Sequence, residues 1–304
     1  MTVLKTGRRP APSAPTERRG GPRAERWRAR LLVAPMSLYV VLFFVAPLIL
    51  LLVYSLGRID VLTFEVSFGW TLDNYRALVD GVYVGAIVRS LVLTVTATAA
   101  CVVIGFPVAL AISRLRGPLR TLCLVGVVVP YWISFVVRTY AWLDLLAPNG
   151  LANKFLTALH LIPDGTELRY STFAIGVGMV YGYLPLMILP IYVALERIDP
   201  AMIEAGHDLG LGRTKVFWKI IVPLAMPGTI AGALLVGIPA TGEYTIPAIL
   251  GGQKTLMAGN VAADQFLGTG NFPFGAAIGS ALMGIMLAVM FASRRRLDRL
   301  EDIA

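Results

Sequence analysis

Six long apolar stretches dominate the sequence and restrict what the chain can fold into. Each is close to or longer than the roughly 20 residues that an α-helix needs to cross about 30 Å of hydrocarbon. They cover residues 31–56, 84–113, 119–146, 172–195, 226–250 and 274–292. Charged residues make up 15% of the 304-residue chain, whereas ordinary globular proteins contain about 25%. We therefore expect an all-α polytopic membrane protein with six transmembrane helices.

The positive charges fall in segments that alternate along the chain. If residues 1–30 are an inner segment, the four inner segments hold 20 of the 27 Lys and Arg residues and the three outer segments hold five. Lys and Arg are retained on the cytoplasmic side of membrane proteins. This distribution predicts a multi-pass protein of the inner (plasma) membrane with both termini in the cytoplasm. In this setting the net charge of +9 predicts contact with membrane lipid and no nucleic-acid partner.

The ends of the chain differ from its apolar middle. Residues 1–30 combine four prolines with scattered arginines, which is typical of a disordered cytoplasmic arm that contacts anionic lipid. The apolar run that follows is too long for a signal peptide, whose apolar core has about 7–15 residues, so we interpret it as a retained anchor. We expect a transmembrane domain at 31–292, which includes a cytoplasmic loop at 196–225, and a cytoplasmic tail at 293–304.

The loop at 196–225 carries the most specific local pattern. Asp199 is suited to cap a helix and Pro200 to occupy its first position. The residues that fall close to one face of this helix are Ala201, Met202, Ala205 and Leu209. Small residues let backbones approach closely. The pattern therefore predicts a cytoplasmic helix that docks into a groove of another protein.

A second short helix is expected after the first. Gly210 and Gly212 should end the first helix, and Thr214 can cap a second one. Pro223 is expected to stop that second helix. The loop is thus predicted to be a helix–turn–helix elbow.

The spacing within this elbow is also distinctive. Glu204-Ala205-Gly206 is followed by three residues, Gly210, nine residues and then Ile220-x-Val222-Pro223. This pattern resembles the EAA signature of the permeases of ATP-binding-cassette (ABC) importers, with Gly206 in place of Ala and Val222 in place of Leu. The resemblance implies a type I ABC importer permease fold, in which this segment is the coupling helix that docks into a cytoplasmic ATPase. The residues that it assigns to ATPase coupling are Glu204, Ala205, Gly206, Gly210, Ile220 and Pro223.

The resemblance also implies partners. The sequence has no G-x-x-x-x-G-K-[ST] phosphate-binding loop, so a separate subunit must hydrolyse ATP. No Ser-His-Asp, Cys-His or paired-carboxylate arrangement has supporting context, and we expect neither enzymatic activity nor a metal or other cofactor in this chain. The implied partners are a second permease subunit, two copies of a cytoplasmic ATPase and an extracytoplasmic solute-binding protein.

Four further stretches narrow the family. Residues 138–142, 148–153, 239–252 and 271–277 resemble the spermidine/putrescine importer permeases. This resemblance implies that the chain forms half of a translocation pathway for polyamines. Importers of other small solutes share parts of the pattern, so an opine, an amino-acid-like compound, a phosphonate or an iron complex stays an alternative substrate. An ion-gradient-driven secondary transporter is the alternative from another class, but it would need internal repeats, and the sequence shows no convincing one.

Glu243 lies inside the fifth apolar stretch, with Pro239 and Pro247 four residues to either side. A carboxylate at that depth costs on the order of 2–3 kcal/mol unless it faces water or a partner. Proline donates no backbone hydrogen bond, so the helix should kink or open here, and such backbone is tolerated where it lines a cavity. We expect Glu243 to face the pathway and help to pass a cation. The alternative is that it pairs with an intramembrane Arg or holds a gate without touching substrate.

Residues near Glu243 and in the third stretch complete the candidate pathway. They are Trp132, Tyr140, Asp144 and Tyr244. Aromatic faces can hold ammonium groups, and a carboxylate adds attraction. Trp and Tyr also concentrate at membrane interfaces without any ligand, and we favour that role for the aromatics. Arg138 and Asp144 are six residues apart, which does not fit one helical face, so no ion pair between them is expected.

Overall fold

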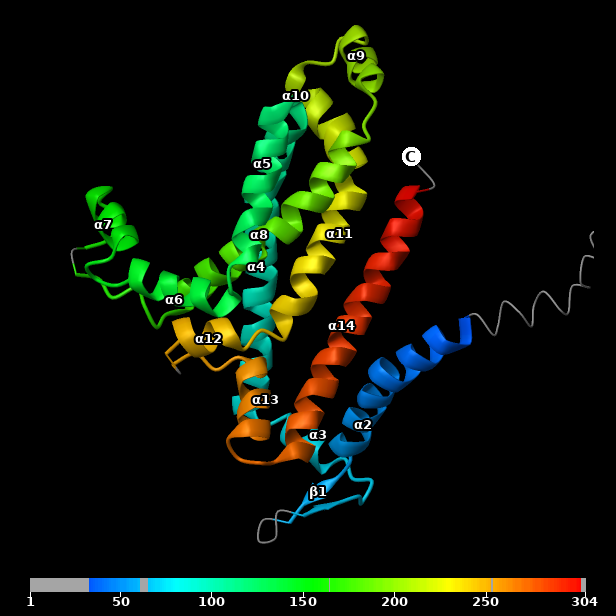
Figure 1. Ribbon diagram of the computed structural model, residues 1–304, viewed down its shortest axis with the longest axis vertical. Coiled ribbons are helices and arrows are strands. Elements are labelled where there is room, and N and C mark those ends of the chain that lie inside the picture. Colours follow the sequence, from blue (N-terminus) through cyan, green and yellow to red (C-terminus); the bar gives the residue numbers. More distant parts are fainter. Residues whose placement is uncertain (1–32, 61–64, 164, 253, 302–304) are drawn as a thin grey trace, which may run out of the picture. The chain divides into compact units, whose positions relative to one another are not determined.

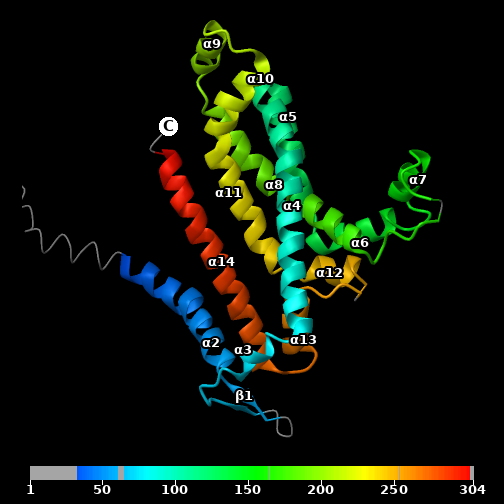
Figure 2. The same cartoon turned by 180° about the vertical axis from the view of Figure 1, so that it is seen from behind.

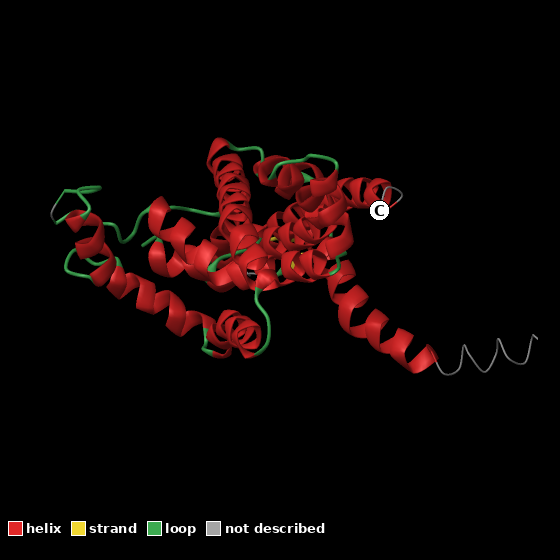
Figure 3. Ribbon diagram, turned by 90° about the horizontal axis from the view of Figure 1, so that it is seen from above, coloured by secondary structure: helices red, strands yellow, loops and turns green. Residues whose placement is uncertain are grey.

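The computed structural model describes residues 33–60, 65–163, 165–252 and 254–301, with side chains described as far as residue 293. The chain divides into two compact units, Met1–Leu50 and Leu51–Ala304. The predicted cytoplasmic arm at residues 1–30 lies outside the described residues. The described parts are almost wholly helical (Figure 3).

The elements follow one another along the chain as helices with one short hairpin. In order they are η1 (Val41–Val45), α2 (Ala46–Ser55), β1 (Arg58–Ile59), β2 (Val66–Ser67), α3 (Asp73–Ala77), α4 (Gly81–Arg114), α5 (Pro118–Val128), η2 (Val129–Trp132), α6 (Phe135–Leu145), α7 (Leu151–Ala158), α8 (Thr172–Glu196), α9 (Pro200–Asp208), α10 (Arg213–Val216), η3 (Phe217–Ile221), α11 (Val222–Thr241), α12 (Thr245–Leu250), α13 (Ala258–Leu267) and α14 (Phe272–Glu301). The strands β1 and β2 are antiparallel, with Arg58 opposite Ser67 and Ile59 opposite Val66.

The helices long and apolar enough to span a membrane match the six predicted stretches in order. Five are single helical segments, namely Val33–Ser55, Gly81–Arg114, Thr172–Glu196, Arg213–Thr241 and Phe272–Ser293. The sixth is a bent pair that starts at Pro118 and ends at Leu145. The all-α, multi-span architecture is confirmed. Helix α14 runs on to Glu301, so the predicted tail begins as a continuation of the last helix.

The third predicted span is broken. Its two parts, Pro118–Trp132 and Phe135–Leu145, meet at an angle of 96°. Ile133 and Ser134 between them adopt extended backbone with ψ near 139° and 132°, and two consecutive extended residues redirect the chain. An uninterrupted span over 119–146 was therefore the wrong expectation.

The fifth span also differs from its predicted bounds. It begins at Arg213, passes through Pro223 without a break and ends at Thr241. Pro223 does not stop the helix because the π-helical turn η3 lies directly before it. Such a turn widens the helix, which relieves the clash that a proline ring makes with the preceding turn. Beyond Thr241 the chain leaves the helix and forms the separate helix α12.

Helix α8 packs against both α4 and α11 in the main core (Figures 1 and 2). Met179, Met187 and Ile191 of α8 are fully buried there. Glycines of α11 let its backbone approach α8 closely: a Cβ on Gly232 would lie 2.9 Å from Sδ of Met187, and one on Gly228 would lie 2.6 Å from the carbonyl oxygen of Pro190. The core thus depends on small residues that let the helices approach one another closely.

Most of the segments predicted to face opposite sides of the membrane lie toward opposite ends of the long helices, whereas α7, in the predicted outer segment 147–171, lies between the two ends (Figures 1 and 2). Helices α9 and α10 and the C-terminal end of α14 lie at one end, whereas β1, α3 and α13 lie at the other (Figures 1 and 2). This separation agrees with the alternation of basic and less basic segments in the sequence. The cytoplasmic location of the α9 end stays a prediction from the charges.

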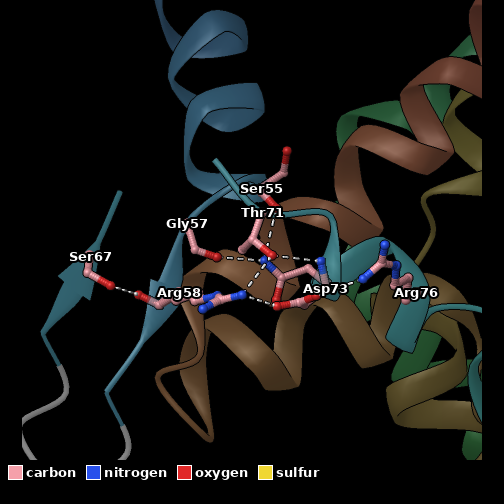
Figure 4. Close-up of polar contacts among 8 residues, drawn as sticks. Ser55, Gly57, Arg58, Ser67, Thr71, Asp73 and Arg76 are labelled. Carbon is pink, nitrogen blue, oxygen red and sulfur yellow. Dashed lines mark hydrogen bonds and ion pairs between the residues drawn. The ribbon is translucent and has the colours of Figure 1, made fainter. Parts of the chain in front are cut away.

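A polar network holds the hairpin against the helix that follows it (Figure 4). Arg58 Nη2 lies 2.5 Å from Oδ2 of Asp73 and also donates to the Thr71 hydroxyl. Asn74 donates to the carbonyl oxygens of Ser55 and Gly57. These contacts fix the turn directly after the first membrane span.

The hairpin is expected to loosen in acid. The Thr71 hydroxyl and then the Arg58 guanidinium hold the pKa of Asp73 below its ordinary value of 3.8. A lowered pKa in the folded state means that this contribution is present above pH 3.8 and is lost as the pH falls through the folded value. Hydrogen exchange of residues 56–80, corrected for intrinsic rates, should therefore speed up as the pH falls below 3.8. Asp73→Asn should remove this pH dependence, and an unchanged dependence in that variant would contradict the assignment.

Candidate functional site

The elbow at 196–225 begins with a capped helix, as predicted. The Asp199 carboxylate accepts a hydrogen bond of 2.9 Å from the backbone N–H of Ala201, and Pro200 occupies the first turn of α9. A carboxylate at this position satisfies a free N–H and interacts favourably with the helix dipole. The sequence therefore sets the start of α9 locally.

The end of α9 is closed by a glycine motif. Gly210 has a φ of +78°, a conformation that favours glycine. The N–H of Leu211 donates to the carbonyl of Gly206 and the N–H of Gly210 donates to that of His207, at 3.1 and 2.9 Å. This pair of bonds is the Schellman motif. Gly210 thus ends α9, as predicted. Its predicted role in ATPase coupling stays a prediction.

Gly206 and the predicted docking face lie on different sides of α9. Gly206 is buried, and a Cβ on it would lie 2.6 Å from Cδ1 of Ile220. The four residues of the predicted face, Ala201, Met202, Ala205 and Leu209, are all exposed. Gly206 therefore lets α9 pack against the helix that follows, and the exposed face is the one available to another protein.

The remaining coupling residues divide in the same way. Glu204, like Ala205, is exposed on α9, and Pro223 is exposed at the start of α11. Ile220 is half-buried in η3 and faces Gly206. The spacing between the two halves of the EAA pattern thus corresponds to a packing contact between α9 and η3. The role of these residues in ATPase coupling stays a prediction.

The breaks in the third and fifth spans line one cavity of about 540 Å³. Residues 131–135 contribute from the bend, Arg138 from α6 and Tyr183 and Leu186 from α8, while Pro239 and Glu243 contribute from the end of the fifth span. Irregular backbone at membrane depth is expected where it borders such a space. The cavity is therefore the candidate translocation site.

Glu243 is 7% exposed, and its carboxylate accepts hydrogen bonds that stabilise the break. Its Oε1 accepts from the backbone N–H groups of Thr245 and Ile246 at 2.8 and 3.2 Å, and its Oε2 accepts from the Tyr183 hydroxyl. The carboxylate caps α12 and compensates for the backbone bonds that the helix end leaves unmade. Among the described residues no Arg or Lys lies within ion-pair distance of it.

Helix α13 supports the same break from its other side. Asn260 donates to the carbonyl oxygen of Tyr244 at 2.8 Å. A Cβ on Gly259 would lie 2.7 Å from the carbonyl oxygens of both Gly242 and Glu243. The opened backbone is therefore held in one conformation by its neighbours.

Arg138 is 8% exposed and lies among aromatic rings. Its guanidinium carbon is 5.1, 5.6 and 5.9 Å from the ring centres of Tyr131, Phe135 and Tyr181. Within the described part of the chain, no carboxylate lies within ion-pair distance of it, and its Nε has no hydrogen-bond partner. In the described part of the chain Arg138 and Asp144 form no ion pair.

The structure brings together only two of the five predicted pathway residues. Trp132 and Glu243 line the cavity, and Trp132 is 83% exposed. Tyr140, Tyr244 and Asp144 are exposed and are not among the residues that line it. Their part in a pathway stays a prediction.

Sequence reasoning missed most of the cavity. Phe135 precedes Arg138 by three residues, so the spacing on one helical face was a usable signal for their contact. No local spacing could predict the contact of Tyr183 with Glu243, because the two residues are 60 positions apart in the sequence and lie in different elements.

Most of the chain matches a known protein family. Residues 101–301 match the model of the family described as binding-protein-dependent transport system inner membrane component. The chain belongs to this family. The resemblance found from the EAA pattern is confirmed, and the protein is a multi-pass inner-membrane permease subunit of the ABC importer type.

Several curated relatives match along most of their length. The spermidine/putrescine transport system permease protein PotB of Escherichia coli (strain K12) is 37% identical over 268 residues, which cover 87% of this chain and 97% of the relative. PotB of Haemophilus influenzae is 34% identical over 277 residues, which cover 90% and 96%. The inner membrane ABC transporter permease protein YdcU of Escherichia coli (strain K12) is 32% identical over 285 residues, which cover 90% of each chain.

Solved structures share the fold. A chain of a bacterial ABC transporter that imports the acidic polysaccharide alginate superposes with a TM-score of 0.67 at 16% identity, covering 91% of this chain and 96% of that one. A chain of the MetNI methionine ABC transporter gives 0.54 at 19% identity, covering 71% and 95%. The predicted importer permease fold is confirmed.

Proposed function

We propose that this permease subunit forms half of the translocation pathway of an ATP-driven polyamine importer. The observation that carries this proposal is the 37% identity to PotB along 97% of that protein. At this similarity and coverage, relatives commonly share a substrate class. The substrate would be a small linear polycation of the putrescine or spermidine type.

The cavity suits such a substrate in two respects. Glu243 supplies a buried carboxylate, and a carboxylate at a buried site attracts an ammonium group more strongly than it would in bulk water. The exposed ring of Trp132 at the same cavity offers a face for cation–π contact.

The energy for transport would come from partners. The exposed face of α9 is proposed to dock into a cytoplasmic ATPase, whose closure on ATP would move the helices as rigid bodies. A second permease would complete the pathway, two ATPase copies would bind below, and an extracytoplasmic binding protein would deliver the solute.

Uptake by proteoliposomes tests the proposal. Vesicles with this chain, the second permease and the ATPase should accumulate labelled putrescine or spermidine only with ATP and the binding protein. Omitting ATP, or using a Walker-site ATPase variant, is the control and should abolish uptake. Amine uptake driven by an ion gradient without ATPase, or ATP-dependent uptake of a phosphonate or opine with no uptake of amines, would contradict the proposal.

A further inference from the structure

Arg138 occupies the aromatic faces beside the cavity that an amine would otherwise use. Three rings surround its guanidinium carbon within 6 Å, those of Tyr131, Phe135 and Tyr181. Tyr131, Phe135 and Arg138 itself also line the cavity with Glu243. The aromatic cage that could bind a ligand cation is therefore filled by a cation of the chain.

The cage is rigidly built. The Tyr131 hydroxyl donates to the carbonyl oxygen of Gly182 at 2.9 Å. Phe135 lies so near Gly182 that a Cβ there would be 3.2 Å from Cε2 of the ring. The rings of Tyr181 and Trp142 contact each other edge to face at 5.4 Å. Each of the three rings thus has a neighbour besides Arg138 that helps to position it.

Cation–π contacts hold the guanidinium. In the described part of the chain no carboxylate pairs with it, and its Nε is unpartnered. A cation–π contact is weaker than a buried hydrogen-bonded ion pair. Arg138 can therefore move away from the cage without breaking an ion pair.

We infer that Arg138 is a built-in competitor of the cationic substrate, which limits how tightly the cavity retains it. The inference rests on the proposed polyamine transport. Glu243 and Arg138 together give the lining residues no net charge. Each ammonium group of a polyamine is attracted by Glu243 and repelled by Arg138, so the lining as a whole gives little extra attraction for each additional charge. Retention in the cavity should therefore not tighten as the charge of the amine increases, which keeps a polycation from being trapped.

Amines of different charge test the inference directly. The permease–ATPase complex in nanodiscs, without binding protein, is dialysed against labelled butylamine, putrescine and spermidine, which carry one, two and three charges. Because repulsion scales with ligand charge, Arg138→Gln should tighten spermidine binding by about tenfold or more, putrescine binding less and butylamine binding least. Arg138→Lys should keep the order of the unaltered protein.

Two variants separate charge from packing. Tyr181→Leu removes one ring and no charge, so it should change the binding of all three amines by a similar factor. Arg138→Met keeps an apolar side chain of similar length and replaces the Gln variant if that one fails to assemble. Failure of both neutral variants to assemble would make Arg138 structural and overturn the inference.

Three further outcomes would contradict the inference about Arg138 or the proposed function. A uniform effect of Arg138→Gln on the three amines would overturn the role of charge. 2-Aminoethylphosphonate, an amine that carries an anionic group, is measured as a fourth ligand. If the unaltered complex binds it and Arg138→Gln does not, Arg138 binds the anionic group of a substrate, and the inference is overturned as well. If the unaltered complex neither binds nor transports any of the amines, the proposed polyamine function itself fails, and that result is distinct from the others.

Discussion

Glu243→Gln is expected to reduce uptake of putrescine or spermidine by about tenfold or more while leaving the complex assembled. The variant keeps an oxygen that can accept from the N–H groups of Thr245 and Ile246, and the Tyr183 hydroxyl can accept from the new amide. Only the negative charge is lost. At an effective dielectric constant near 20, a charge pair a few ångströms apart contributes several kcal/mol, so loss of even part of it is measurable in ATP-dependent uptake by proteoliposomes.

Glu243→Ala separates the structural role of this carboxylate from its charge. The Ala variant leaves buried backbone N–H groups without a hydrogen-bond partner, which costs about 1–3 kcal/mol of stability for each group. The melting temperature of the complex should therefore fall by at least about 4 °C. The Gln variant should melt close to the unaltered protein. Asp144→Asn is the matched control, because it removes a carboxylate that is exposed and does not line the cavity. Uptake by Glu243→Gln equal to that of the unaltered protein would reduce Glu243 to a helix cap.

Gly206→Leu is expected to lower co-purification of the ATPase by roughly ten- to a hundredfold while membrane insertion is retained. Even the Cβ would lie 2.6 Å from Cδ1 of Ile220, so α9 must shift relative to η3. Overpacking costs about 1–3 kcal/mol, and each 1.4 kcal/mol that falls on docking weakens binding about tenfold. Affinity purification from membranes with quantification of both subunits measures the effect.

A rescue experiment identifies its cause. Gly212→Leu is the control, because the space around Gly212 is open and its φ of −67° suits any residue. If Gly206 acts through packing inside the elbow, Ile220→Ala combined with Gly206→Ala should restore ATPase binding relative to Gly206→Ala alone. No rescue would indicate that Gly206 touches the ATPase directly, and unchanged co-purification of Gly206→Leu would contradict a coupling role for the elbow.

Several features of the fold could be predicted because their causes are local. The five or six candidate spans follow from the length of each apolar run, and the start of α9 follows from Asp199 and Pro200 in adjacent positions. The opening near Glu243 follows from prolines that cannot donate to the helix. Pro223 shows the limit of the same rule, because the π-turn before it let the helix continue.

The sequence by itself determined the family, the positions of the five or six candidate spans and the position of the helix–turn–helix elbow, since these depend on residues that are close together in the chain. Only the tertiary structure decided what the elbow glycine and the buried charges contact. Gly206 faces Ile220, and Glu243 accepts a hydrogen bond from the Tyr183 hydroxyl. Arg138 lies among rings from η2, α6 and α8. The physical reason is that these contacts depend on the 96° bend and on how closely the helices approach, and neither is encoded in a local pattern.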